Sequence, residues 1–193
     1  MKSVCVFCGS SSGNNPIFAG MAAQVGQEIA IRRMRLVYGG GSVGLMGILA
    51  DAAMNAGGEV IGVIPQALLD KELGHGGLTE LVVVGSMHER KSLMADRADA
   101  FLALPGGFGT FEEFCEVLTW AQLGLHDKPC ALLNVNGFYD SLLALFDQAV
   151  TDGFLRPEHR ALVLTGFSPD EVLDRMATFI PTKVDKWIDL RKS

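Results

Sequence analysis

Strand-like and helix-like segments alternate along the whole chain. Continuous apolar runs predict strands at residues 4–7, 36–38, 60–64, 81–84, 100–104, 131–135 and 162–164. The stretches between them predict helices near residues 16–33, 43–55, 87–97, 111–123 and 139–151, and a last helix that begins after Ser168. Alternating strands and helices predict a parallel sheet that is covered by helices on both faces.

The composition of the strands sharpens this fold class. Neighbouring positions such as Val63 and Ile64 are both apolar, as in strands that are buried on both faces. A closed eight-fold barrel typically needs about 250 residues, and the chain has 193. The sequence therefore predicts an α/β, Rossmann-like doubly wound sheet of about seven mostly parallel strands. We expect one nucleotide-binding domain over residues 1–193, with residues 183–193 as a short extra helix or a loose end.

Glycine is over-represented, and its placement is informative. The chain has 23 glycines, whereas average usage gives about 13 or 14. Eight of them fall at three predicted strand–helix junctions, where glycine allows close backbone approach and the next helix offers free N–H groups. Three such turns at one sheet edge predict a phosphate site. These glycines are Gly9, Gly39, Gly40, Gly41, Gly44, Gly106, Gly107 and Gly109.

Charge and composition exclude several classes of protein. The net charge of −6 argues against a general nucleic-acid or membrane surface. No apolar run approaches the roughly 20 residues of a membrane span, and the first residues do not resemble a signal peptide. The four cysteines are expected to be reduced thiols, because a spacing of three on a strand points Cys5 and Cys8 to opposite faces. A cytoplasmic protein without a bound metal or cofactor is the resulting prediction.

The second junction matches a dinucleotide fingerprint, Gly39-x-Gly41-x-x-Gly44. An acidic residue for the ribose hydroxyl normally ends the next strand, but here that strand ends in Val63-Ile64-Pro65. The pattern therefore favours phosphate contact, through residues such as Gly40 and Gly41, over NAD. A purely structural tight turn is the remaining interpretation.

Two further segments carry candidate chemistry. In 105–113, a Pro-Gly-Gly turn leads through Thr110 to the paired acids Glu112 and Glu113. Thr110-x-x-Glu113 predicts a capping box, so Glu113 is either a helix cap or a catalytic carboxylate. In 86–91, Arg90 and Lys91 lie in a predicted first helical turn, where cations oppose the helix dipole and call for an anionic partner.

The chain also resembles the LONELY GUY family, the cytokinin riboside 5′-monophosphate phosphoribohydrolases, long described as possible lysine decarboxylases. The resemblance rests on Met87-His88-Glu89-Arg90-Lys91 and on the segment from Pro105 to Glu113, and it extends over nearly the whole chain. It departs from many members at Phe108, where they have Tyr. A pyridoxal phosphate decarboxylase would need a Schiff-base lysine with partners for the cofactor ring, and no lysine here lies in such a context.

The resemblance implies a hydrolase that cleaves the N-glycosidic bond of a nucleoside 5′-monophosphate, with AMP-like or prenylated AMP as substrate. It implies Arg90 and Glu113 as the catalytic pair and a homodimer as the assembly. A broader purine nucleotide nucleosidase and a non-catalytic nucleotide-binding module are the alternatives. The expected substrate-binding residues, from the resemblance and the glycine turns, are Gly9, Ser10, Gly40, Gly41, Glu72, Lys91, Gly106, Gly107, Gly109, Thr110, Glu112 and Thr119.

Overall fold

The predicted fold class is confirmed. The computed structural model describes residues 1–71 and 74–181, which form one sheet in the order β4-β3-β2-β1-β5-β6-β7 with parallel pairing throughout. The strands are β1 (Ser3–Phe7), β2 (Arg35–Tyr38), β3 (Val60–Pro65), β4 (Glu80–Val84), β5 (Phe101–Ala103), β6 (Cys130–Leu133) and β7 (Val163–Gly166).

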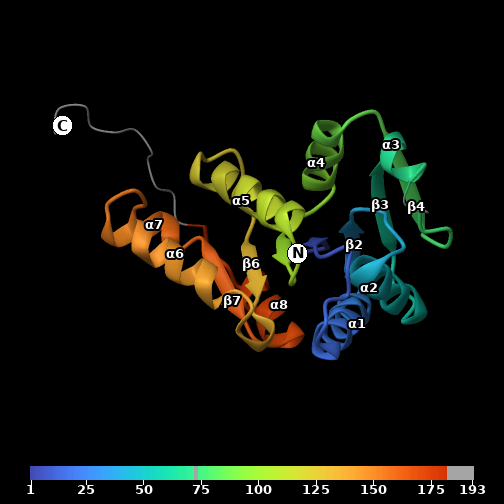
Figure 1. Cartoon of the computed structure of the whole chain (residues 1–193), viewed down its shortest axis with the longest axis horizontal. Coiled ribbons are helices and arrows are strands. Elements are labelled where there is room, and N and C mark those ends of the chain that lie inside the picture. The colour runs from blue at the N-terminus through green and yellow to red at the C-terminus, as the bar shows by residue number, and fades with distance from the viewer. Residues whose placement is uncertain (72–73, 182–193) are drawn as a thin grey trace.

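Helices cover both faces of the sheet (Figure 1). One face carries α1, α2 and α8, and the other carries α4, α5 and α6. The helices are α1 (Pro16–Ile31), α2 (Gly44–Asn55), α3 (Gln66–Leu69), α4 (Met87–Asp96), α5 (Phe108–Gln122), α6 (Asp140–Thr151), α7 (Pro157–Arg160) and α8 (Pro169–Ala177), with a 3-10 turn, η1, at Val135–Gly137.

The central strand β1 shows why its sequence is apolar throughout. Val4 and Val6 belong to the core beneath α1 and α2, whereas Cys5 and Phe7 belong to the core beneath α4 and α5. Cys8, just beyond the strand, lies in the first of these cores. Cys5 and Cys8 thus face different layers, as predicted, and both are free thiols.

The winding of the sheet reverses next to β1. The chain moves outward from β1 to β4 and then returns to place β5 on the other side of β1. The turns that follow β1 and β5 are therefore neighbours, and the Gly9 N–H donates to the Pro105 carbonyl at 3.1 Å. Ligands of doubly wound sheets bind at this kind of switch point.

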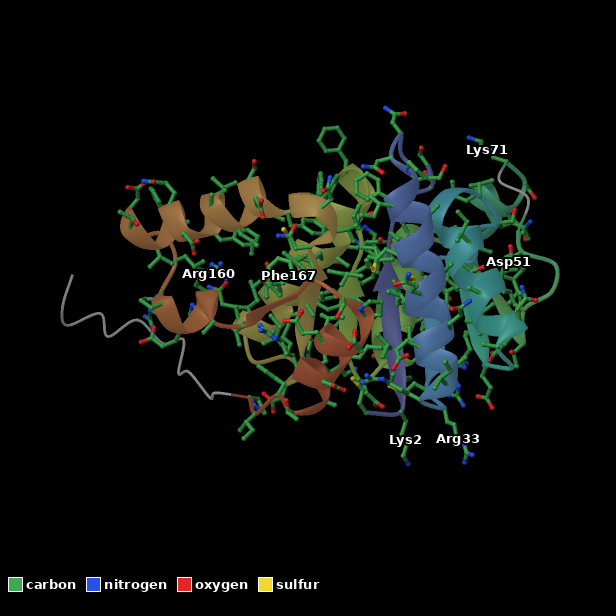
Figure 2. The ribbon with its side chains drawn as sticks, turned by 90° about the horizontal axis from the view of Figure 1, so that it is seen from below. Lys2, Arg33, Asp51, Lys71, Arg160 and Phe167 are labelled. Atoms are coloured by element: carbon green, nitrogen blue, oxygen red, sulfur yellow. The ribbon has the colours of Figure 1, made fainter. Side chains whose placement is uncertain are left out.

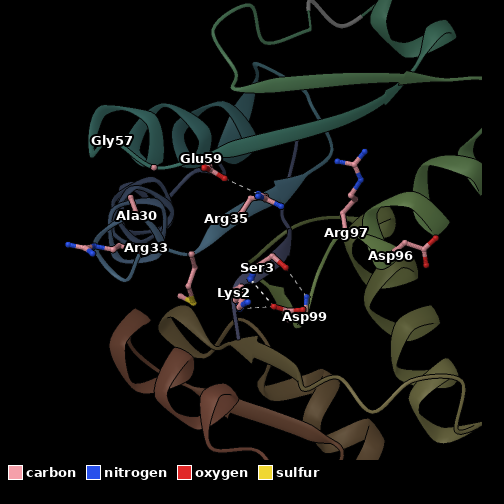
Figure 3. Close-up of a pocket in the computed structure, with 12 residues that line it drawn as sticks. Lys2, Ser3, Ala30, Arg33, Arg35, Gly57, Glu59, Asp96, Arg97 and Asp99 are labelled. Atoms are coloured by element: carbon pink, nitrogen blue, oxygen red, sulfur yellow. Dashed lines mark hydrogen bonds and ion pairs between the residues drawn. The ribbon is translucent and has the colours of Figure 1, made fainter.

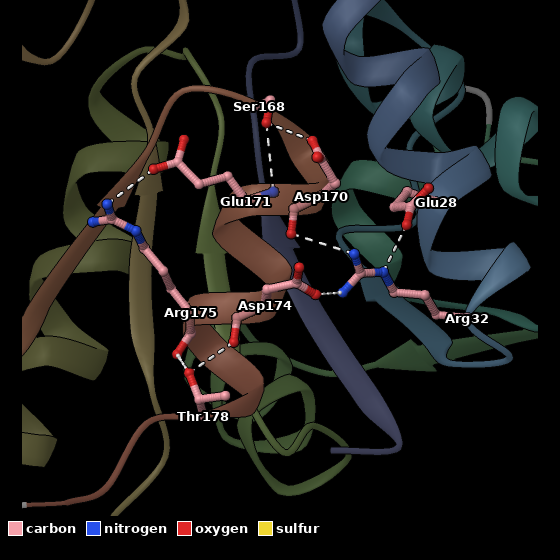
Figure 4. A network of polar contacts seen from close by, with 8 residues as sticks. All are labelled: Glu28, Arg32, Ser168, Asp170, Glu171, Asp174, Arg175 and Thr178. Carbon is pink, nitrogen blue, oxygen red and sulfur yellow. Dashed lines mark hydrogen bonds and ion pairs between the residues drawn. The ribbon is translucent and has the colours of Figure 1, made fainter.

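Ion pairs of Arg32 connect α1 to α8, two helices that are distant in sequence. Arg32, at the end of α1, contacts Glu28 at 2.7 Å and Asp174 of α8 at 2.6 Å (Figure 4). The start of α8 matches its prediction, because the Ser168 side chain accepts from the Glu171 N–H and Pro169 occupies the first helical position. The expected extra helix at 183–193 lies outside the described residues.

Long charged side chains mark the two ends of the sheet. Lys2 and Arg33 lie where β1 begins, and Lys71 lies toward the opposite end (Figure 2). No helix among the described residues is long and apolar enough to cross a membrane.

Candidate active site

A buried ion pair lies at the carboxyl end of the sheet, between α4 and α5. Arg90 Nη1 donates to Glu113 Oε1 at 2.6 Å, and each side chain is about 10% exposed. Arg90 Nε also donates to the Val63 carbonyl, two residues before the end of β3, at 3.1 Å. The guanidinium is therefore fixed between strand β3 and a carboxylate. Arg90 and Glu113 are two predicted site residues that the fold brings into direct contact.

Helix capping sets Arg90 in this position. Ser86 is the N-cap of α4, and its hydroxyl accepts from the Glu89 N–H, while the Glu89 carboxylate accepts from the Gly85 N–H. These two contacts satisfy donors at the helix start. Arg90 is the residue after Glu89, and it is buried on the inward face of α4.

Gly39 makes room for the guanidinium. A Cβ atom at Gly39 would overlap Arg90 Nη2. The first glycine after β2 is therefore required by the arginine of α4, 51 positions later in the chain. The sequence pattern groups Gly39 with the phosphate turns, and only the folded chain reveals this second role.

On balance, burial makes the negative charge of Glu113 less favourable than it is in water. Burial raises the pKa of Glu113 above its usual value, and the charge and hydrogen bond of Arg90 offset only part of this effect. A carboxylate with a raised pKa is a stronger base than an exposed glutamate, which suits it to accept a proton in acid–base catalysis.

The start of α5 corrects one expectation. The helix begins at Phe108, its N-cap is Gly107, and no side chain caps it. Thr110 thus lies inside the first turn and Glu113 in the second, so the predicted capping box is wrong. The reason is that Gly107 already supplies the extended backbone of an N-cap, and Thr110 packs where a Cβ of Gly106 would lie. Glu113 is left to pair with Arg90 instead.

Because α5 begins at Phe108, its free backbone N–H groups border the same cavity as the Arg90–Glu113 pair. The first N–H groups of a helix have no intrahelical acceptor, and here they belong to Phe108, Gly109 and Thr110. A helix N-terminus of this kind favours an anion such as phosphate. A cavity of about 300 Å³ collects these groups, and it is lined by Val6, Phe7, Cys8, Gly9, Ser10, Gly39, Met46, Leu68, Arg90, Met94, Gly107, Phe108, Gly109, Thr110 and Glu113.

The turn after β2 supports the turn after β1. Gly44 has a φ of +60°, and a Cβ there would overlap the backbone of Ser10. The Leu45 N–H, at the start of α2, donates to the Gly9 carbonyl at 3.0 Å. The third glycine of the fingerprint therefore allows the α2 start to pack against the β1 turn.

Gly40 and Gly41 lie beside this cavity without lining it. The Gly40 carbonyl accepts from the His75 N–H at 3.1 Å, and Gly41 forms an isolated bridge with Gly74. Their backbone groups thus hold the segment that follows residue 73. Glu72 lies outside the described residues.

Lys91 and Thr119 lie away from the cavity lining. The Lys91 ammonium contacts Glu112 and Glu116 of α5; burial opposes its charge, but these two carboxylates outweigh that effect and raise its pKa. The Thr119 hydroxyl donates to the Cys115 carbonyl and lines a separate cavity of about 260 Å³ between α5 and α6. The contact between Lys91 and Glu112 is thus a second ion pair that joins α4 to α5, next to the Arg90–Glu113 pair.

The remaining lining residues carried no polar signal in the sequence. Met46, Leu68 and Met94 border the cavity from three different helices, and they were indistinguishable from core residues. Within the described ranges, no three His, Cys, Asp or Glu side chains are grouped as a metal site would require.

The fold and the site together define a doubly wound α/β protein with a buried arginine–carboxylate pair beneath glycine-rich turns. The chain belongs to the family described as "Possible lysine decarboxylase", whose model matches residues 46–176.

The curated relatives are similar over most of the chain. It is 52% identical over 180 residues to "Probable cytokinin riboside 5'-monophosphate phosphoribohydrolase LOGL9" of Oryza sativa subsp. japonica, covering 93% of this chain and 79% of that protein. It is 49% identical, with the same coverage, to "Cytokinin riboside 5'-monophosphate phosphoribohydrolase LOG5" of Arabidopsis thaliana. A solved structure of the molybdenum cofactor carrier protein of Chlamydomonas reinhardtii superposes with a TM-score of 0.68 at 21% identity, covering 91% of this chain and 95% of that one, which shows the fold alone.

Proposed function

We propose that this protein hydrolyses the N-glycosidic bond of nucleoside 5′-monophosphates, with cytokinin nucleotides among its substrates, and releases the free base and ribose 5-phosphate. The Arg90–Glu113 pair carries the proposal, because it is buried at the base of a cavity that helix N–H groups border. The names of relatives that are about 50% identical over nearly all of the chain support the same reaction.

The geometry suggests a division of labour in this reaction. Breaking an N-ribosidic bond develops positive charge on the ribose, as in other glycosyl transfers. The Glu113 carboxylate stabilises that charge or takes a proton from the attacking water, and its raised pKa suits the proton transfer. Arg90 holds Glu113 in place and offers its remaining N–H groups to the negative charge that moves onto the leaving base.

The turns supply binding energy away from the bond that breaks. The first N–H groups of α5 and the turn after β1, with Gly9 and Ser10, face the cavity and would take the 5′-phosphate. Holding the phosphate orients the sugar carbon against Glu113. Gly106 contributes by admitting Thr110 into the turn. Lys91 and Glu112, which do not line the cavity, would act by keeping α4 and α5 in register.

We also propose that the protein is a homodimer that works in the cytoplasm. Helix α6 has no buried residue; Leu145 within it and Phe154 shortly after it are 62% and 88% exposed. Apolar surface of this kind is typical of an interface between subunits. A second copy on this face would cover the cavity that Thr119 lines. The free cysteines among the described residues fit a reducing compartment.

The test is to incubate the protein with AMP, GMP, CMP and prenylated AMP and to measure the free base by chromatography. We expect base release, fastest with prenylated AMP. Similar turnover of AMP and GMP would instead identify a broad purine nucleotide nucleosidase. Binding without base release would identify a nucleotide-binding module and contradict the proposal.

Two substitutions connect the activity to the site. Glu113→Gln keeps the shape and a hydrogen-bond acceptor for Arg90 but removes the charge, so kcat should fall about 10²- to 10⁴-fold in a folded protein. Arg90→Ala should remove a comparable share of activity, about 10²- to 10³-fold. Glu59→Gln, at an exposed ion pair far from the cavity, is the matched control. Normal turnover by the Glu113→Gln variant would assign that carboxylate to structure alone.

A further inference from the structure

The carbonyl of Leu104 needs a partner that the sheet does not supply. In the β1–β5 ladder the Leu104 N–H donates to the Phe7 carbonyl at 2.9 Å, so the N–H that would next reach the Leu104 carbonyl is that of Gly9. The Gly9 N–H donates to the Pro105 carbonyl at 3.1 Å instead, so the ladder leaves the Leu104 carbonyl without its expected donor. Leu104 is fully buried, and a buried carbonyl without a partner is costly.

The hydroxyl of Tyr139 supplies that partner. It donates to the Leu104 carbonyl at 2.6 Å across 35 positions of sequence. Tyr139 is itself 1% exposed, and burial raises the pKa of its hydroxyl well above the usual value, so it stays a donor. The hydrogen bond thus replaces one rung of the ladder at the end of β5.

A small polar cluster fixes Tyr139 in turn. The Asn134 side chain accepts from the Tyr139 N–H at 2.8 Å and donates to Asp140 at 2.7 Å. The rings of Phe111 and Phe138 meet the Tyr139 ring edge to face, with centroids 6.4 and 5.0 Å away. Since Phe111 belongs to the first turns of α5, this contact connects Tyr139 to the helix that carries Glu113.

The residue that Tyr139 holds begins the turn of the candidate active site. The Leu104 N–H donates to Phe7 of β1 at 2.9 Å, and the carbonyl of Pro105 accepts from Gly9 at 3.1 Å. The turn is therefore fixed to β1 on one side and to Tyr139 on the other. Its position decides where α5 begins, and hence where Glu113 stands relative to Arg90.

We propose that Tyr139 is a positioning residue of the hydrolase. Its hydrogen bond to the Leu104 carbonyl fixes the position of the 105–107 turn relative to β1. This inference rests on the proposed function. It differs from a role in core packing alone, because it requires the hydroxyl group and predicts an effect on kcat in protein that is fully folded.

The chain contains its own matched control. It has two tyrosines, and Tyr38 is also fully buried, at the end of β2. In the described part of the chain the Tyr38 hydroxyl has no hydrogen-bond partner. Tyr139→Phe and Tyr38→Phe thus make the same chemical change in comparable burial, and only the first removes a hydrogen bond to the turn.

The experiment compares kcat and KM for base release in the two variants, well below their melting temperatures, with the folded fraction measured by circular dichroism. We expect Tyr139→Phe to lower kcat about tenfold or more, since sub-ångström displacement of reacting groups costs rate steeply. Tyr38→Phe should stay within about twofold of the parent, as for a change that removes no contact. A Tyr139→Phe protein with a lower melting temperature and normal kcat would overturn the proposal.

The positioning role of Tyr139 can be tested even if the proposed reaction is wrong. If the parent protein releases no base from any nucleotide, the proposed function fails by itself. The position of the turn is then read from AMP binding by titration calorimetry. Weaker AMP binding by Tyr139→Phe than by Tyr38→Phe would support the positioning role, and equal binding would overturn it.

Discussion

The two ends of the sheet are both hollowed, and they differ in ways that identify the site. The cavity at the amino end is larger, about 660 Å³ against about 300 Å³ at the carboxyl end. It also holds more charges, among them Lys2, Arg35, Arg97 and Asp99 (Figure 3). Neither volume nor the number of charges therefore distinguishes the candidate active site.

Helix polarity separates the two cavities. The larger cavity is bordered by residues that follow the ends of α1, α2 and α4, such as Arg33, Gly57 and Arg97. Helix C-termini carry partial negative charge, which is enough to explain cations there. The smaller cavity receives the start of α5, whose free N–H groups favour an anion.

Burial of charge separates them as well. In the larger cavity, Arg35 pairs with Glu59 through side chains that are 44% and 63% exposed, and Asp99 accepts from the backbone N–H groups of Lys2 and Ser3, which lower its pKa. In the smaller cavity both partners of the ion pair are about 10% exposed. Keeping a charged pair out of water costs free energy, and this cost at the carboxyl end points to chemistry.

A pair of glycine substitutions would test this contrast with the largest expected effects. Gly39→Ala places a methyl group against Nη2 at the far end of the Arg90 side chain, so the guanidinium must shift relative to Glu113; kcat should fall about 10²-fold, while stability changes less than in Gly58→Ala. Gly58→Ala, in the larger cavity, places a methyl group 2.7 Å from the Ala30 side chain and 3.0 Å from the Ala53 carbonyl. It should lower the free energy of unfolding by about 1–3 kcal/mol and leave kcat unchanged.

Kinetics and urea denaturation on the same two proteins provide the measurement. The expected result is a crossed pattern, with activity lost in one variant and stability lost in the other. A fall of kcat in Gly58→Ala, measured on folded protein, would contradict the assignment of catalysis to the carboxyl end alone.

Sequence patterns predicted the fold because the strands are apolar on both faces and the helix starts are marked. The start of α8 followed from the local sequence of Ser168, Pro169 and the acids Asp170 and Glu171. The start of α5 did not, because Thr110 and Glu113 have the spacing of a capping box, and only tertiary contacts with Gly106 and Arg90 direct them elsewhere.

The candidate site shows the same limit. Arg90 and Glu113 were found as separate motifs, since each lies at a recognisable helix start. Their contact, the space that Gly39 leaves for them and the hydrogen bond from Tyr139 to Leu104 depend on residues far apart in sequence. No local pattern encodes such contacts.

The pH dependence of stability should separate the buried carboxylate from an exposed one. A carboxyl group whose pKa is higher in the folded than in the unfolded state stabilises the fold in acid, and this contribution is lost as the pH rises through the folded-state pKa. Burial raises the pKa of Glu113. The melting temperature of Glu113→Gln, relative to the parent, should therefore rise as the pH increases above about 4, the ordinary pKa of a glutamate.

Thermal melts at a series of pH values give the measurement, with Glu59→Gln from the larger cavity as the background. The two differences should diverge as the pH rises. Parallel curves would mean that the fold does not oppose the charge of Glu113. The difference in burial between the two ion pairs would then have no measurable effect on stability.

The smallest effects are expected from the cations of the larger cavity. Arg35 and Arg97 form exposed ion pairs with Glu59 and Glu80, and pairs of this kind contribute about 0–1 kcal/mol. The double variant Arg35→Gln, Arg97→Gln should therefore unfold with a free energy within about 1 kcal/mol per pair of the parent. Its kcat and KM for base release should be unchanged, because no charge that it removes lies near the α5 start. If KM instead rose, the larger cavity would contribute to substrate binding, and helix polarity would not be sufficient to tell a binding end of this sheet from a structural one.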